Sequence, residues 1–557
     1  MDRRQFLQQV VSVGSAAALL AACAPAPPAS SPGTVAPVAK PATSLLPTYR
    51  PAALRPQPDF PSQGPLYEDG YVNYPQSPIK AVSQPPGTGS SVTAFVPQLQ
   101  PPPTALDSNP AWQEVNRQLH STFNFVLTPF TDYTTKLATI MAGSASDLPD
   151  VLSFYGGYAA ASHIPTFLDQ SMADLAPCLA GDAANDYPNL AAIPTFAWKN
   201  AGSVYNRHLY LIPLERYLPG TLLLKNTTIW DQEIGSGYVP KDAEDLKRIL
   251  QQLNRPDEDR WATGSYQGVA FDIVYYASMF GAPNKWRVDS DGKLVKDLEA
   301  PEFKAAVGYV RGLVGAGLFH PNTLQYAGIT QASTDFAAGK WAVYVNGFGL
   351  GWAQVWRQGL HRKPPVNFLP VAPFAARAGD PPAHYLGAGF QSTTAIKKAS
   401  PDRIKEILRI LDWLAAPFGS QEDLLLTAGI KDVDYKLDYH GNPVLTDRGN
   451  ADANNVPWKY TMQHPQVMYI ADIPGYAQAA HDAEQVLIPL GVSDPTLGYY
   501  SATMGSQGTV LQKRFMDDLT EIISGQRPLS DYDQLVRDWQ DGGGNQIRAE
   551  LQQAMSG

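Results

Sequence analysis

The sequence predicts an α/β protein with two or more lobes. Between residues 91 and 154, short apolar runs of strand length alternate with stretches of helical period. This order is typical of a sheet whose strands run parallel. The chain has 557 residues, far more than a single hydrophobic core organises. Hydrophobic residues make up 44% of it, a usual share for a globular protein.

The globular body is expected to begin near Ser91, and its first elements follow one another closely. Residues 92–96 are a continuous apolar run and predict a buried strand. Trp112, Val115 and Leu119 recur at helical spacing and predict a helix over 111–122. The next expected elements are a strand over 123–127, a helix over 133–142 that ends at Gly143, and a strand over 147–154 that follows a proline turn.

Three later segments also have a helical period, and no internal repeat accompanies them. Their apolar residues recur every three or four positions. The predicted helices cover residues 303–314, 404–414 and 510–522.

The first 22 residues have the features of an export signal. Arg3 and Arg4 form a positive start, and residues 10–20 are an apolar run too short to span a bilayer. Arg3-Arg4 followed by Phe6-Leu7 resembles a twin-arginine signal, with the general secretory route as the alternative. Residues 20–23, Leu-Ala-Ala-Cys, resemble the lipobox of bacterial lipoproteins. We therefore expect Cys23 to carry lipid and to anchor the mature protein outside the cytoplasm.

A proline-rich tether is expected to follow, over residues 23–90. Sixteen of the 67 residues from 24 to 90 are proline, which favours extended structure over helix or sheet. Phe60, Tyr71 and Tyr74 are unusual for a pure linker. Part of residues 55–80 is therefore a candidate to lie against the folded body.

Charge and cysteine content exclude some function classes. The formal net charge is −10, and it becomes −11 without residues 1–22, because Arg3, Arg4 and Asp2 are lost. An acidic chain is a poor candidate for binding nucleic acid, which relies on Lys and Arg. The only cysteines are Cys23 and Cys178, so lipidation of Cys23 leaves no intrachain disulfide. The sequence has no Gly-x-x-x-x-Gly-Lys-Ser/Thr loop, so any ATP hydrolysis belongs to a partner.

Six segments in the same order resemble the extracytoplasmic solute-binding proteins of ABC importers, of the large sugar-binding type. One is a helix that ends in a small-residue turn before Leu-Pro-Asp opens a strand. Another is an aromatic-Ala-Ala-Gly-Lys segment that leads into a strand. The resemblance covers essentially all of 91–557. The segments are 133–154, 209–213, 280–318, 336–346, 395–422 and 523–539.

This resemblance implies a two-lobed, periplasmic-binding-protein-like α/β fold of type II, with a ligand cleft between lobes that hinge crossovers join. It implies that a monomer captures a carbohydrate, expected to be an oligosaccharide, and delivers it to a membrane permease powered by a cytoplasmic ATPase. We expect the first lobe to comprise residues 91–213 and 388–455. The second lobe is expected to comprise residues 214–387 and 456–557.

Most candidate binding residues follow the matched strands. Phe271 and Asp272 instead resemble the family's second-lobe aromatic-polar position, Gln391 lies at the second expected crossover, and Trp261 lies in an expected glycine-containing loop. In open α/β sheets the ligand lies beyond the carboxyl ends of strands, and sugars need aromatic faces together with polar side chains. Arg216 is the only convincing cation among the candidates, which favours neutral or mixed oligosaccharides over uronate-rich ones. The candidates are Phe154, Tyr155, Glu215, Arg216, Tyr217, Trp261, Phe271, Asp272, Phe348, Trp352 and Gln391.

No metal or other cofactor is expected. Some members of the resembled group carry a calcium loop, but residues 254–260 here contain Pro256 and no glycine, which breaks the loop chemistry. Residues 289–292, Asp-Ser-Asp-Gly, lack the later glutamate of a calcium loop and predict a hairpin turn instead.

Three other functions stay open at this point. A secreted glycoside hydrolase needs only a suitably spaced pair of carboxylates, which a sequence cannot exclude. However, the nine histidines have no zinc spacing, and no Gly-x-Ser-x-Gly elbow is present. A surface adhesin would suit the tether but not parallel α/β lobes. Peptides or polyamines are the alternative cargo of a binding protein.

Overall fold

The computed structural model of the chain describes residues 45–159, 161–266, 268–324 and 329–556. The expected export signal, the expected lipidation site Cys23 and the start of the tether lie outside the described residues. Among the helices of the described part, none combines the length and the apolar character needed to cross a membrane.

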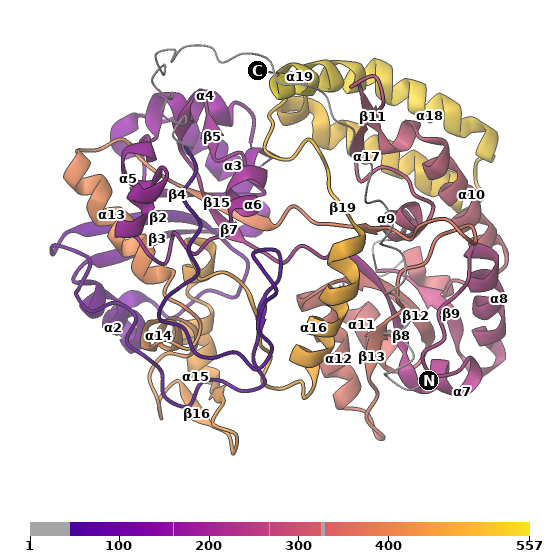
Figure 1. Cartoon of the computed structure of the whole chain (residues 1–557), viewed down its shortest axis with the longest axis horizontal. Helices are drawn as coiled ribbons and strands as arrows, with labels where there is room; N and C mark the ends of the chain where they lie inside the picture. Colours follow the sequence, from indigo (N-terminus) through magenta and orange to yellow (C-terminus); the bar gives the residue numbers. More distant parts are fainter. Residues whose placement is uncertain (1–44, 160, 267, 325–328, 557) are drawn as a thin grey trace, which may run out of the picture. The chain divides into compact units, whose positions relative to one another are not determined.

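The first lobe is built on a mixed five-stranded sheet in the order β3-β2-β4-β15-β7. The expected parallel arrangement holds for the first three strands, while β15 runs antiparallel to both β4 and β7. Figure 1 shows this sheet among the helices on the left. The strands are β2 (Ser91–Gln98), β3 (Thr122–Pro129), β4 (Val151–Tyr155), β7 (Ile212–Glu215) and β15 (Phe390–Ile396).

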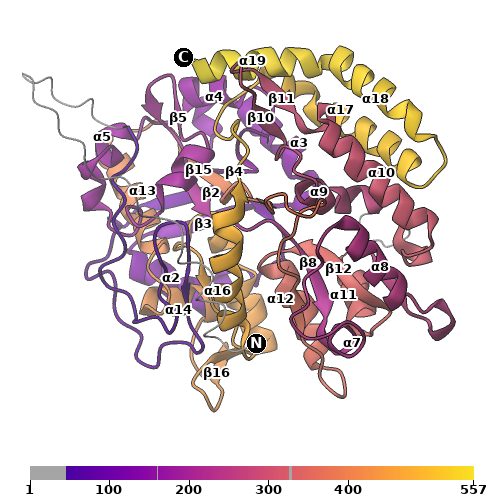
Figure 2. The ribbon, with the colours of Figure 1, turned by 45° about the vertical axis from the view of Figure 1, so that its right-hand side comes forward.

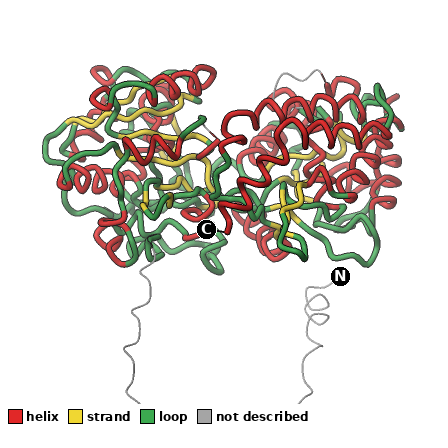
Figure 3. The backbone as a smooth tube through the Cα atoms, turned by 90° about the horizontal axis from the view of Figure 1, so that it is seen from above, coloured by secondary structure: helices red, strands yellow, loops and turns green. Residues whose placement is uncertain are grey.

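Helices cover both faces of this sheet because side chains alternate along each strand. In β2, Val92 and Val96 pack into one core with α2 and α13, whereas Phe95 packs into another core with α3 and α4. Figure 3 shows helices in red around the yellow strands. The helices of this lobe are α2 (Pro110–Leu119), α3 (Phe130–Met141), α4 (Ile164–Ser171), α5 (Ala176–Leu179), α6 (Thr195–Asn200), α13 (Pro401–Leu414), α14 (Gln421–Ala428) and α15 (Asp447–Gly449), with the short pairs β5 (Val204–Tyr205), β6 (His208–Leu209), β16 (Tyr435–Leu437) and β17 (Pro443–Leu445).

The expected helix over 111–122 is present but ends three residues early. Asn109 caps its start by accepting a hydrogen bond from the Trp112 N–H at 2.9 Å. His120 adopts a left-handed conformation with φ of 48°, which stops the helix and lets β3 begin at Thr122. Trp112 is buried together with the other apolar residues of that face, as the spacing predicted.

The second lobe is built on a four-stranded sheet in the order β13-β8-β12-β9. Strand β8 runs antiparallel to both neighbours, and β12 runs parallel to β9. Residues 289–292 form the predicted turn between β10 and β11. The strands are β8 (Thr221–Asn226), β9 (Trp261–Gly264), β10 (Trp286–Val288), β11 (Leu294–Lys296), β12 (Trp341–Gly347), β13 (Phe368–Pro370), β14 (His384–Tyr385) and β19 (Gly491–Val492).

Two groups of helices enclose this second sheet. One core joins β8 and β12 to helices that include α8, α9, α10 and α17, and the other joins the same strands to α11, α12 and α16. Figure 2 shows the C-terminal α17 and α18 beside α10. The helices are α7 (Thr227–Glu233), α8 (Ala243–Leu253), α9 (Val269–Met279), α10 (Pro301–Gly315), α11 (Ile329–Ala337), α12 (Leu350–Leu360), α16 (Tyr476–Leu487), α17 (Ala502–Ile523), α18 (Tyr532–Trp539) and α19 (Asn545–Ser556).

The second half of the expected tether packs against the folded body. Strand β1 (Asp69–Gly70) pairs in parallel with β18 (Val467–Met468). Tyr71 and Tyr74 are each only 4% exposed and pack against Phe418. The tether therefore does not extend to residue 90. The docked residues lie within the stretch 55–80 whose aromatic side chains made it a candidate for docking, and burial of those side chains stabilises the contact.

Candidate functional site

Within the described residues, three connections join the two lobes. The chain leaves the first sheet at Glu215 and enters the second at Thr221, and it returns between Tyr385 and Phe390. The third connection lies between Met462, which packs in the first-lobe core, and Ile473, which packs in the second. The lobe boundaries expected from the sequence imply all three connections, and the segments beside the first two hold four of the eleven candidate residues.

The first two connections are hydrogen-bonded to each other and form one hinge. Gly387 N–H donates to the Leu218 carbonyl at 2.7 Å. Gly220 N–H donates to Nε2 of His384 at 3.0 Å, and burial lowers the pKa of His384 to about 4. His384 is therefore neutral at physiological pH and has a free lone pair for this hydrogen bond.

Gly220 is expected to tolerate no side chain. A β-carbon at this position would meet the Tyr385 carbonyl oxygen, which is backbone and cannot rotate away. We expect Gly220→Ala to lower the free energy of unfolding by about 1–3 kcal/mol. Urea unfolding measures this change. Gly312→Ala is the matched control, because Gly312 lies in α10 with open space around it. Equal stability of Gly220→Ala and wild type would contradict the expectation.

Three of the sequence candidates, Tyr155, Arg216 and Gln391, come together beside the hinge. Arg216 donates to the Gln391 side-chain oxygen and, at 2.7 Å, to the Glu215 carbonyl. The Gln391 amide donates to the Tyr155 hydroxyl at 3.2 Å. All three side chains are half-buried. The three therefore form one polar group supplied by β4, by β15 and by the first crossover.

Phe130, Lys459 and Tyr460 join this cluster, although they were not among the sequence candidates. Phe130 is 47% exposed and its ring lies 5.2 Å from that of Tyr155. Phe130 follows the end of β3, so the same strand-end rule that selects Tyr155 would have found it. Lys459 lies in a short turn, Pro457–Tyr460, to which no sequence pattern points.

Lys459 adds a second positive charge next to Arg216. Burial and the charge of Arg216 lower the pKa of Lys459 to about 8. Its ammonium lies 5.6 Å from the ring of Tyr460. Burial raises the pKa of Tyr460, so its hydroxyl stays protonated at neutral pH.

On the second-lobe side, Tyr217 and Phe348 lie together at the end of β12. Their rings are 5.4 Å apart, and Phe348 is 6% exposed. Tyr217 packs so closely over Gly349 that a β-carbon there would collide with its ring. Leu350, the first residue of α12, is 74% exposed. Arg216 and Tyr217 are adjacent in the sequence, but Arg216 lies with side chains of the first lobe and Tyr217 with side chains of the second.

Three predicted binding residues belong to the hydrophobic core or are fully enclosed. Phe154 and Trp352 have no exposed surface, and Trp352 stacks on Trp356 within the core around α12. Asp272 is also fully buried, and it accepts a hydrogen bond from the Ser265 hydroxyl at 3.0 Å. Burial raises the pKa of Asp272 well above its usual range. The prediction that these three contact solute is wrong. Phe154 lies on an enclosed face of its sheet, because side chains alternate along a strand. Asp272 lies in α9 and Trp352 in α12, and both side chains are fully buried.

Trp261 lies at the wrong end of its strand. It begins β9 rather than ending it, and its ring packs against His320 at 4.6 Å. The sequence placed Trp261 in a loop, whereas β9 pairs with the start of β12 at this point. Phe271 lies in α9, and its side chain is outside the described part of the chain.

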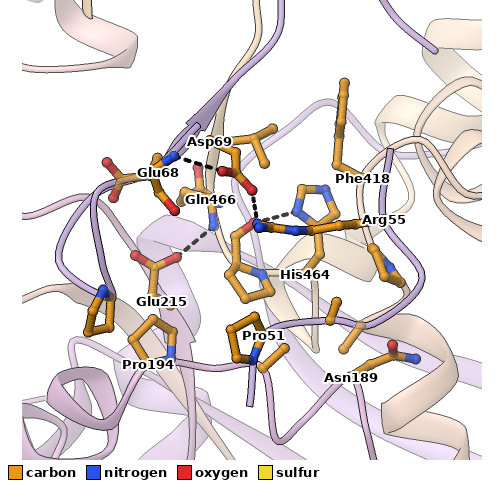
Figure 4. A pocket seen from close by; sticks show the side chains of 18 of the residues that line it. Pro51, Arg55, Glu68, Asp69, Asn189, Pro194, Glu215, Phe418, His464 and Gln466 are labelled. Carbon is orange, nitrogen blue, oxygen red and sulfur yellow. Dashed lines mark hydrogen bonds and ion pairs between the residues drawn. The ribbon is translucent and has the colours of Figure 1, made fainter. Parts of the chain in front are cut away.

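Glu215 points away from Arg216, into a small cavity behind the hinge. The cavity, about 90 Å³ in volume, is lined by the N-terminal segment and by residues around His464 (Figure 4). Glu215 accepts a hydrogen bond from the Gln466 N–H at 2.6 Å. Burial, helped by the nearby Glu68 carboxylate, raises the pKa of Glu215 to about 8. The expectation that Glu215 binds solute beside Arg216 is therefore wrong, since successive side chains of a strand face opposite ways.

The lobes also touch at the start of α17. The Tyr500 hydroxyl accepts a hydrogen bond from the His163 N–H at 3.3 Å, and its ring lies 5.6 Å from that of Tyr158. Ser162 donates to the Gly505 carbonyl at 2.9 Å. These contacts join the start of α17 and the residue just before it, in the second lobe, to the loop after β4 in the first lobe.

Two lobes joined by hinge crossovers, with a polar and aromatic cluster beside the hinge, define a protein that encloses a ligand between its lobes. Residues 113–423 match the family of bacterial extracellular solute-binding proteins, and this stretch is more than half of the chain. The chain belongs to that family. The protein therefore binds a solute outside the cytoplasm.

Two curated relatives from Bacillus subtilis (strain 168) are similar over most of the chain. The polygalacturonan/rhamnogalacturonan-binding protein YtcQ is 24% identical over 396 residues, which are 67% of this chain and 75% of the relative. The lipoprotein LipO is 21% identical over 492 residues, which are 84% of this chain and 92% of the relative.

Solved structures share the two-lobed fold. The ABC-transporter substrate-binding protein FusA of S. pneumoniae, in complex with kestose, superposes with a TM-score of 0.60 at 14% identity, covering 83% of this chain and 98% of FusA. An HMO-binding, ABC-transporter-associated solute-binding protein from Bifidobacterium longum infantis gives 0.59 at 14% identity, covering 85% and 98%. At 14% identity, these two superpositions show a similar fold only.

Proposed function

We propose that this protein, as a monomer, captures an oligosaccharide between its lobes and delivers it to the permease of an ABC importer. The observation that carries the proposal is the cluster of Tyr155, Arg216 and Gln391 beside the hinge, with the exposed ring of Phe130 next to it. Aromatic rings stack on the apolar faces of sugars, while guanidinium and amide groups hydrogen-bond their hydroxyls. The names of the similar proteins support the same cargo, since YtcQ is named for pectic polysaccharides and FusA holds kestose.

The proposed role is binding without catalysis. The family is one of solute-binding proteins, and the cluster beside the hinge consists of cationic, amide and aromatic groups. Glu215, the candidate carboxylate adjacent to Arg216 in the sequence, lies on the other side of the strand. A glycosidase needs two carboxyl groups that flank one glycosidic bond, and this cluster offers none from the described residues.

The test is a thermal-shift screen of the purified protein against oligosaccharides, peptides and polyamines, with each bound compound recovered and weighed by mass spectrometry. A ligand at 100 times its Kd should raise the free energy of unfolding by about 2.7 kcal/mol. An oligosaccharide recovered intact supports the proposal. A cleaved sugar would indicate an enzyme, and a peptide or polyamine as the sole stabilising compound would contradict the cargo.

We propose a small revision of the lobe boundaries. Val456, Trp458, Tyr460 and Met462 pack in the core of the first lobe. This packing supports an end of that lobe after Met462 rather than at residue 455. The other boundaries are proposed near those expected, with β7 ending the first segment at Glu215 and β15 beginning the second at Phe390.

We propose that lipid on Cys23 anchors the protein to the membrane. The Leu-Ala-Ala-Cys segment at residues 20–23 supports this, as does the similarity to the lipoprotein LipO. We expect Cys23→Ser to move the protein from the membrane fraction to the soluble fraction, measured by immunoblotting after fractionation. Cys178→Ser is the control, because Cys178 packs on the first-lobe core. A Cys23→Ser variant that stays with the membrane would contradict the anchor.

A further inference from the structure

We infer that the solute of this site is an acidic oligosaccharide whose carboxylate is bound between Arg216 and Lys459. This inference rests on the proposed function and adds the chemical class of the sugar. It differs from the neutral or mixed sugar that the sequence favoured, because the sequence offered only one cation. The structure supplies a second, from a turn more than two hundred residues away along the chain.

The positive charge of Arg216 is not neutralised by its partners. Its guanidinium donates to the Glu215 carbonyl and to the Gln391 side-chain oxygen, and both acceptors are uncharged. The Glu215 carboxyl faces the cavity behind the hinge and bonds to the Gln466 N–H. Because burial raises the pKa of Glu215 to about 8, this carboxyl is mainly protonated at neutral pH. Arg216 therefore keeps its charge with no ion-pair partner among the described residues.

The positive charge of Lys459 likewise has no negatively charged partner among the described residues. Lys459 is half-buried, yet across the described ranges no ion pair or hydrogen bond joins its ammonium to another side chain. Burial lowers the pKa of Lys459, and the positive charge of Arg216 lowers it further. Two like charges held near one another, both partly removed from water, are unfavourable unless an anion lies between them.

A carboxylate on a sugar ring fits this pair of cations. The guanidinium of Arg matches the two oxygens of a carboxylate, and an ammonium adds a point charge without a fixed direction. A neutral sugar bound at the same place would shield both cations from water without pairing them. A polyamine would add further positive charge. The net charge of the chain is −10, so its overall charge does not attract anions. Any attraction for a carboxylate must therefore come from these two local cations.

The aromatic rings beside the cations indicate that the anion is carried by a sugar. Tyr155 and Phe130 form a T-shaped pair next to Arg216. Part of the Phe130 ring stays open to solvent, as its exposed fraction of 47% shows. Such a ring offers an apolar face to the C–H surface of a pyranose. A small inorganic anion would make no use of it.

The experiment compares matched acidic and neutral sugars on the wild-type protein by isothermal titration calorimetry. The probes are tetrasaccharides of galacturonate, mannuronate and glucuronate, each with its methyl ester, and neutral and sulfated tetrasaccharides. We expect at least one acidic probe to bind ten or more times more tightly than its own ester. Equal affinity for acid and ester, or tighter binding of the sulfated probe, would overturn the inference and leave the proposed function standing. If none of these probes bound, the inference would fail, and the thermal-shift screen would decide the proposed function.

A variant then assigns the effect to Lys459. Lys459→Met keeps the length of the side chain and removes its charge. We expect it to weaken binding of the preferred acidic probe at least fivefold, to leave binding of the ester within twofold, and to reduce the salt dependence of the acid's Kd. Lys436→Met is the matched control, because Lys436 is exposed in β16. Equal losses for acid and ester would overturn the role of Lys459.

Discussion

Replacing Arg216 with alanine is expected to weaken binding of an oligosaccharide by more than tenfold. The guanidinium holds Gln391, which in turn holds Tyr155, so its loss removes one ligand contact and releases two neighbouring side chains. A tenfold change corresponds to about 1.4 kcal/mol of binding free energy, and hydrogen bonds to a charged group contribute about 1.5–3 kcal/mol. Titration calorimetry with a sugar identified in the screen measures the loss. Tyr155→Ala is expected to have a loss of the same order.

The control separates binding from folding. Arg117 is 71% exposed on its side chain and pairs with Glu114 one turn earlier in the same helix. We expect Arg117→Ala to leave affinity unchanged. Thermal unfolding of the Arg216→Ala variant should show that the fold persists. Unchanged affinity in both the Arg216→Ala and the Tyr155→Ala variants would show that the solute binds elsewhere.

The second large effect is a fall in stability as pH rises from about 4.5 to about 8. Glu68, Glu215 and Glu484 lie together between the N-terminal segment, the hinge and α16, and all are almost fully buried. Burial raises the pKa of Glu484 to about 7, and burial together with a hydrogen bond to Glu484 raises that of Glu68 well above its usual range. These carboxyls are held protonated in the folded protein.

The sign of the effect follows from proton counts. Between pH 4.5 and 8 the folded protein binds more protons at these sites than the unfolded chain, so the free energy of unfolding decreases with rising pH. Glu406 and Glu550 act in the other direction below that window. Both carboxylates accept hydrogen bonds from hydroxyl and backbone groups, Glu406 also from Arg403 and Glu550 also from Gln546. These bonds outweigh burial and lower the pKa of each to about 2, so the stability they give is lost as pH falls from 4.5. We therefore expect maximum stability near pH 5.

Glu215→Gln tests this directly. Glutamine keeps an oxygen to accept from the Gln466 N–H but cannot ionise. We expect the loss of stability between pH 4.5 and 8 to shrink by about 2–4 kcal/mol, since each unit of pKa shift corresponds to about 1.4 kcal/mol. Urea unfolding at several pH values provides the measurement. Glu258→Gln, at an exposed position, should leave the pH profile unchanged. A Glu215→Gln variant with the wild-type profile would refute the buried-carboxyl explanation.

The sequence by itself determined the order and type of the main elements. Hydrophobic period predicted β2, α2, β3, α3 and β4 in order, and it also predicted the later helices α10, α13 and α17. These features are local, since the spacing of apolar residues along a few turns decides which side of an element is buried. The strand-end rule likewise found Tyr155, because the end of β4 is visible as the end of an apolar run.

The tertiary structure alone decided which candidates share a site. Trp352 and Arg216 both follow matched strands, yet Trp352 is buried in the core, whereas Arg216 hydrogen-bonds to Gln391. The sequence made Tyr71 and Tyr74 candidates to lie against the body, but only the tertiary structure identifies Phe418 as their partner. The physical reason is that burial and charge pairing depend on contacts between residues hundreds of positions apart. Such contacts leave no periodic signal in either of the segments that make them.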